Sequence, residues 1–199
     1  MKIKLVLLSI MFLALFSCVT TEFIERGKYE LEVGKQQMIP YQKGQKINFI
    51  HSKGYAFGFK VVSDTLVWTD NNSHNYTNVK YSYYDTFQQK TVQLVSEYPA
   101  LGIAFRVSAE PRSSNRLSIY VNDLVGSVLI DENYKFKAQT DYGDIFHETI
   151  LINGKTYNNV IETQLRSGKS GESYKSVLFN EQGLLQIKIS DDEIFSINN

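Results

Sequence analysis

The chain has 199 residues with 21 basic and 21 acidic side chains, so its formal net charge is zero. The absence of a basic excess argues against a nucleic-acid-binding protein, and we expect no nucleic-acid partner. The only cysteine is Cys18, which excludes an intrachain disulfide.

The first residues have the order of parts found in a secretion signal. Lys2 and Lys4 precede an apolar run over residues 5–16, which only Ser9 interrupts. A helix needs about 20 residues to cross roughly 30 Å of hydrocarbon, so this run is too short to stay in the bilayer. Its length and basic flank are instead typical of a signal peptide that is removed on export.

The residues that follow, Leu15-Phe16-Ser17-Cys18, resemble the lipobox of bacterial lipoproteins. The resemblance implies that diacylglycerol is attached to the sulfur of Cys18 and that the chain is cleaved before it. We therefore expect a signal peptide at 1–17, a lipidated tether at 18–25 and a single β domain at 26–199. No acidic run follows Cys18, which favours a lipid-anchored protein in the outer membrane that faces the periplasm.

Apolar and polar residues alternate along much of the remaining chain, at 47–49, 57–61, 103–109, 117–121 and 185–189. Successive side chains of a strand point to opposite faces, so this pattern predicts strands with one buried and one wet face. Such strands are typical of antiparallel sheets. We expect an all-β fold with a curved, mainly antiparallel sheet, either a half-barrel or an open barrel or sandwich, after the cleaved lipoprotein signal peptide.

Two turns can be placed from local sequence. Asn153-Gly154 predicts a type I′ hairpin, because both residues tolerate positive φ. Asp191-Asp192 predicts a turn into a last strand near Phe195 and Ile197.

The C-terminal third carries a second resemblance. The segments 153–160, 177–180 and 183–185 are similar to the ending of small lipoproteins of Bacteroidota. The resemblance implies a curved antiparallel sheet in the cell envelope, with no assigned activity.

We find no pattern that indicates catalysis or metal binding. The three histidines, His51, His74 and His147, are not spaced as metal ligands, and we expect them to be solvated or at sheet edges. No Gly-x-Ser-x-Gly elbow is present. The acidic residues Asp141, Asp144 and Asp191-Asp192 fit turns. We therefore expect no enzyme, no catalytic residues, no metal and no cofactor.

Aromatic residues form the one candidate ligand surface. Trp68, Tyr76, Tyr81 and Tyr83 would line a shallow groove for a glycan or an acyl chain. The alternative, which we favour, is that they pack in the core or pair across strands. Separately, Asp64-Thr65-Leu66 resembles the acceptor for O-glycosylation of exported proteins in Bacteroidota, with Thr65 as the modified residue.

Three functions remain open. The leading hypothesis is a membrane-anchored, non-enzymatic binding or scaffold module for another envelope component, recognised by an exposed patch or a free sheet edge. The alternative is a carrier or sensor of an apolar ligand such as a lipid or acyl chain, which would need an apolar cavity of roughly 300–1,000 Å³. The third is an envelope hydrolase, with a cleft in which carboxylates or histidines converge.

Overall fold

The computed structural model describes residues 21–71, 81–167 and 175–198. The predicted signal peptide, the lipidation site Cys18, Tyr76 and His74 lie outside these ranges. Contacts divide the chain into two units, one of residues 1–28 and 70–86 and one of residues 29–69 and 87–199.

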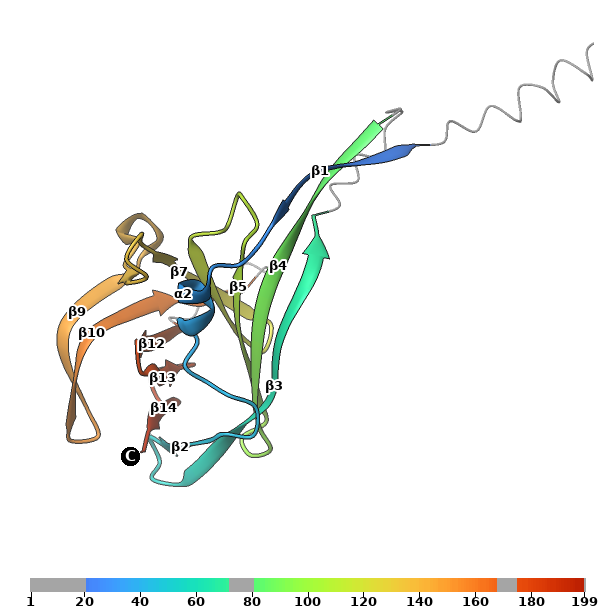
Figure 1. Ribbon diagram of the computed structural model, residues 1–199. Coiled ribbons are helices and arrows are strands. Elements are labelled where there is room, and N and C mark those ends of the chain that lie inside the picture. Colours follow the sequence, from blue (N-terminus) through green and yellow to red (C-terminus); the bar gives the residue numbers. More distant parts are fainter. Residues whose placement is uncertain (1–20, 72–80, 168–174, 199) are drawn as a thin grey trace, which may run out of the picture. The chain divides into compact units, whose positions relative to one another are not determined.

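The chain folds almost entirely into strands (Figure 1). In chain order the elements are β1 (Glu22–Tyr29), α2 (Val33–Gln37), β2 (Lys46–His51), β3 (Ala56–Asp70), β4 (Tyr81–Ser96), β5 (Leu101–Ser108), β6 (Arg116–Val121), β7 (Leu124–Ile130), β8 (Phe136–Lys137), η1 (Thr140–Tyr142), β9 (Ile145–Ile152), β10 (Lys155–Gln164), β11 (Arg166–Ser167), β12 (Ser176–Asn180), β13 (Gly183–Lys188) and β14 (Ile194–Ile197).

The larger unit is a nearly closed, barrel-like antiparallel sheet. Its strands follow the order β7-β6-β5-β4-β3-β2-β14-β13-β12-β10. Strand β10 continues through Leu165 into β11, where Arg166 and Ser167 pair with Val125 and Leu124 of β7. This pairing brings the two ends of the sheet together and confirms the predicted all-β, curved, antiparallel fold.

Side chains fill the inside of this sheet. The predicted alternation is confirmed in β5, where Ile103, Phe105 and Val107 are buried while Ala104 and Arg106 on the other face are partly exposed. The largest fully buried side chains of the unit are Phe49, Phe59, Phe179, Phe195, Leu94, Ile103, Leu117, Ile119, Ile161, Leu184, Leu185 and Ile187.

The segment before β2 contributes to this core. Tyr41 is buried there with its ring 5.4 Å from that of Phe105, and its hydroxyl oxygen accepts a hydrogen bond from the amide of Leu184. Burial raises the pKa of the Tyr41 phenol far above its usual value, because the phenolate would be desolvated.

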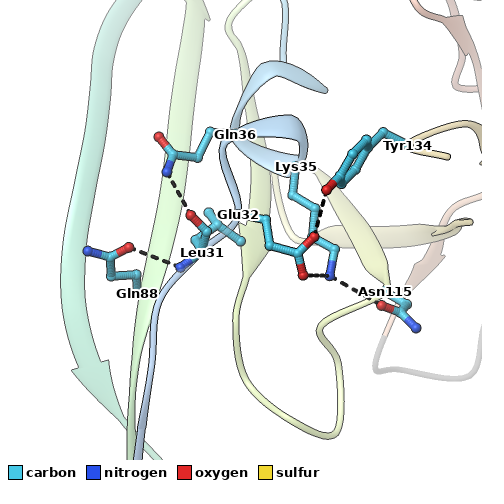
Figure 2. A network of polar contacts seen from close by, with 7 residues as sticks. All are labelled: Leu31, Glu32, Lys35, Gln36, Gln88, Asn115 and Tyr134. Carbon is cyan, nitrogen blue, oxygen red and sulfur yellow. Dashed lines mark hydrogen bonds and ion pairs between the residues drawn. The ribbon is translucent and has the colours of Figure 1, made fainter. Parts of the chain in front are cut away.

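A network of polar contacts holds α2 in the same unit (Figure 2). Lys35 donates to the carboxylate of Glu32 at 3.1 Å and to the Asn115 side chain at 3.4 Å. The hydroxyl of Tyr134 donates to the other Glu32 oxygen at 2.9 Å. The Lys35 ammonium, followed by the Tyr134 hydroxyl, lowers the pKa of Glu32. Lys35 is the only one of these groups that is buried, and the Glu32 carboxylate and the Asn115 oxygen satisfy it.

The smaller unit contains β1 up to Lys28 and the first residues of β4, and β1 pairs with β4. Arg26 forms an ion pair with the buried carboxylate of Asp85, and the Asp85 amide donates to the Asn71 side chain at 2.8 Å. Strand β1 begins at Glu22, so part of the predicted tether forms a strand.

Candidate functional site

Strand β9 stands apart from the other long strands because it lies at one end of the sheet order. Strand β9 pairs with β10 in a register that places Ile152 opposite Lys155 and Ile145 opposite Glu162. Within the described parts of the chain no strand pairs with its second edge. The backbone groups along that edge are therefore available to another strand.

Three large apolar side chains of β9 face solvent. Leu151 is 69% exposed, Ile145 51% and Phe146 50%. The strand sequence, Ile145 to Ile152, contains neither lysine nor proline, the residues by which edge strands commonly prevent pairing. Its only acidic residue is Glu148, near the middle.

The register of β9 on β10 places two of these side chains on one face. Residues directly opposite each other in an antiparallel pair share a face. Phe146 lies opposite Ile161, whose side chain belongs to the main core, and Ile150 lies opposite Tyr157, which belongs to a smaller cluster on the other face. Leu151 follows Ile150 and so points away from the smaller cluster, as Phe146 does.

A change of face within the β9–β10 hairpin makes this arrangement possible. Both Tyr157 and Val160 belong to the smaller cluster, although strict alternation would put them on opposite faces. Asn159, between them, has φ of +52°, a conformation that asparagine adopts more readily than most residues. The twist at Asn159 keeps the apolar side chains at both ends of β9 on its exposed face.

The hairpin is held in place at its tip and on its buried face. Asn153 and Gly154 have φ of +48° and +78°, which confirms the predicted type I′ turn. The side-chain amide of Asn153 donates to the carbonyl of Ile197 in β14 at 2.9 Å. Beneath the hairpin, the smaller cluster consists of Ile152, Tyr157, Val160, Leu178 and Leu185. The hydrogen bond at the turn and the apolar cluster under the hairpin therefore hold β9 in place.

Three polar side chains on β9, β10 and β12 form a row of contacts. The ring of His147 lies 3.1 Å from one oxygen of Glu162, and Ser176 donates to the other oxygen at 2.8 Å. The carboxylate therefore lies between the serine and the imidazole. A serine nucleophile needs the imidazole next to its hydroxyl, so this row does not have the order of a Ser-His-acid triad.

The burial of His51 shows that one expectation was wrong. It is 4% exposed, stacked on Tyr55 at 4.4 Å and packed edge-on against Phe195 at 4.9 Å, whereas we expected a solvated or edge residue. Strand β14 pairs with β2 at this position and covers the imidazole. His147, on the edge strand, fits the prediction.

The predicted aromatic residues lie on strands. Trp68 is on β3 in the larger unit, while Tyr81 and Tyr83 are on β4 in the smaller unit, and all three are partly exposed. The groove remains a prediction. Thr65 is also exposed on β3, where its hydroxyl donates to the Thr91 carbonyl at 3.4 Å, and its glycosylation remains a prediction too.

Two features are absent from the described residues. No group of three or more His, Cys, Asp or Glu side chains among them is placed to hold a metal ion. No helix in this part of the chain has the length and apolar character needed to cross a membrane.

Over the described residues, the fold and the edge strand define a class of protein, an antiparallel barrel-like domain with an apolar edge strand whose outer edge pairs with no other described strand. Comparison with protein-family models, with curated proteins and with solved structures finds no match for the chain.

Proposed function

We propose that this protein is a lipid-anchored, non-enzymatic binding module of the cell envelope, which recruits an extended segment of another protein along β9. The observation that carries the proposal is the free edge of β9 with its exposed Phe146 and Leu151. A strand added to a sheet edge gains main-chain hydrogen bonds, while its side chains provide specificity.

The chemistry of β9 describes the segment that would fit it. Phe146 and Leu151 favour apolar partners near the two ends, and Glu148 favours a lysine or arginine near the middle. A second copy of β9 fits less well. Antiparallel pairing of two copies of β9 centred on Glu148 would place the two Glu148 side chains directly opposite each other on one face. Like charges in directly opposite positions disfavour pairing.

Crosslinking along the strand tests this proposal. A photoreactive amino acid at position 151, in the full chain made in cells of the source organism, should give one discrete adduct. Introducing Phe146→Lys into the same chain should suppress the adduct, because a lysine on the edge blocks strand addition. A photoreactive residue at Val33, which is 66% exposed on α2, is the matched control.

Two results would contradict the binding proposal. One is an adduct that forms equally from positions 33 and 151 or that survives Phe146→Lys. The other is an adduct with twice the mass of the chain, which would mean self-association. In the expected case, a peptide from the crosslinked partner should slow hydrogen exchange of the β9 amides in the purified protein.

The membrane anchor is tested separately. Cys18→Ser should abolish incorporation of labelled palmitate and release the protein from the membrane fraction, because diacylglycerol is attached through the cysteine sulfur. Retention of label in the serine variant would refute lipidation at this residue without affecting the proposal for β9.

A carrier of apolar ligands finds less support. Cavities of about 200 and 270 Å³, lined by residues that the structure describes, open on the surface of the larger unit. Both are smaller than the usual size of roughly 300–1,000 Å³ for a ligand site. The first is lined by two arginines and an aspartate, which do not suit an acyl chain.

A further inference from the structure

A cavity of about 200 Å³, with two arginines in its lining, lies where the sheet closes on itself, between β7 and the β10–β11 strand. We call this place the seam. The backbones approach closely there: a Cβ added to Gly126 would lie 3.0 Å from the carbonyl oxygen of Gln164. The hydroxyl oxygen of Thr163 lies 3.3 Å from the Ser127 carbonyl oxygen. The cavity therefore has walls made of paired strands.

Two arginines from different strands line the cavity beside one tyrosine ring. The guanidinium carbon of Arg116, at the start of β6, lies 5.6 Å from the centre of the Tyr142 ring. That of Arg166, in β11, lies 5.7 Å from the same centre. Arg166 also donates to the Tyr142 carbonyl at 2.9 Å. Both guanidiniums therefore lie within the range of cation–π attraction to the same ring.

Asp144, the one acidic residue of the lining, does not neutralise the two arginines. Asp144 is 4% exposed, and its two oxygens accept hydrogen bonds from the Thr163 hydroxyl at 2.6 Å and the Gln139 amide at 2.9 Å. Among the described residues, no carboxylate lies within 4.0 Å of either Arg116 or Arg166. The lining therefore contains two guanidinium cations and only one carboxylate, and that carboxylate is already hydrogen-bonded to other groups. The lining carries an excess of positive charge.

We propose that the seam cavity is a binding site for a phosphate group. Guanidinium groups match phosphate oxygens with paired N–H donors. Ser127 and Gln164 also line the cavity, and each carries a hydrogen-bond donor in its side chain. So many donors suit the three terminal oxygens of a phosphate better than the two of a carboxylate. The small volume limits the ligand to the phosphate and a short attached group.

This site is independent of the proposed binding at β9. Its ligand is either a free phosphate compound or the phosphate of a lipid headgroup, and binding experiments on the purified full chain separate the two. Inorganic phosphate should bind to the protein, as measured by calorimetry at constant ionic strength, and acetate at the same concentration should bind more weakly. Vesicles of phosphatidylcholine with and without phosphatidic acid then test the headgroup.

Variants locate the site. Arg116→Gln or Arg166→Gln should weaken phosphate binding about 10- to 100-fold, as expected for a lost hydrogen bond to a charged group. Arg116→Lys should also weaken it, because an ammonium lacks the planar pair of donors. Arg112→Gln, which alters an exposed arginine outside the cavity lining, should leave phosphate binding unchanged. Vesicle binding that is lost in Arg116→Gln would assign the headgroup, and vesicle binding that persists would assign the free compound.

Three outcomes would overturn the proposal. They are absence of phosphate binding, equal loss of affinity in the Arg112 and Arg116 variants, and acetate binding as tightly as phosphate. Thermal unfolding of each variant without phosphate shows whether a change in binding arises from a change in folding.

Discussion

Replacing Gly183 with alanine should strongly destabilise the larger unit. Gly183 begins β13 with φ of +112°, a conformation that residues with a Cβ rarely adopt. A Cβ built there would lie within 3 Å of two atoms of the buried Tyr41 side chain, its hydroxyl oxygen and the ring carbon that carries it. Because Tyr41 is packed against Phe105, it cannot swing away without opening the core.

The expected cost has two parts. Holding alanine in an unfavourable backbone conformation costs roughly 1–3 kcal/mol. Displacing the Tyr41 hydroxyl leaves the amide of Leu184 without its hydrogen-bond acceptor, which costs about 1–3 kcal/mol for a buried group. Gly183→Ala should therefore lower the free energy of unfolding by roughly 2–6 kcal/mol, a large part of the ~5–15 kcal/mol typical of a domain.

Urea unfolding, followed by far-UV circular dichroism, measures this cost. Gly54→Ala is the matched control, since Gly54 has φ of +89° and a Cβ there would meet no atom within 4 Å. Gly54→Ala should lower the free energy of unfolding only by the cost of the unfavourable backbone conformation, about 1–3 kcal/mol. Combining Gly183→Ala with Tyr41→Phe should cost less than the sum of the single changes, because the closest clash is gone. If Gly183→Ala proved no more harmful than Gly54→Ala, the packing of Tyr41 against β13 would be wrong.

Two other predictions concern the same unit. The raised pKa of Tyr41 keeps this phenol neutral in the folded state, so above about pH 10, where unfolded chains ionise, stability should fall as pH rises. Tyr41→Phe should reduce that slope in urea titrations between pH 9 and 11, and an unchanged slope would contradict the assignment. Gly126→Ala should cost about 1–3 kcal/mol by crowding the backbone at the seam. Gly102→Ala, with its nearest contact at 3.6 Å, should be nearly neutral; equal effects would contradict close approach at the seam.

Local pattern predicted the individual strands well. The alternation around Phe105 and the turn at Asn153-Gly154 depend on side-chain direction and backbone preference within a few residues, and both are confirmed. The last strand also lies where it was expected, at Ile194–Ile197. Such features need no knowledge of distant partners.

The candidate sites were harder to predict from sequence. Asp144 was expected only in a turn, yet it is buried against Thr163, which is distant in the sequence. The exposed position of Phe146 and Leu151 depends on which strand pairs with which, and their segment reads simply as an apolar strand. A signal was present in retrospect, since β9 lacks the alternation of strands with one wet face.

By itself the sequence determined the class of fold, because two-residue alternation separates a buried face from a wet one wherever a strand pairs. It also supplied the motif that predicts a lipid anchor at Cys18. The tertiary structure alone decided that the sheet closes between β7 and β11, that β9 is left at an edge, and that Arg116 and Arg166 meet at one ring. These outcomes depend on strand order and register, which arise from contacts between residues far apart in the chain.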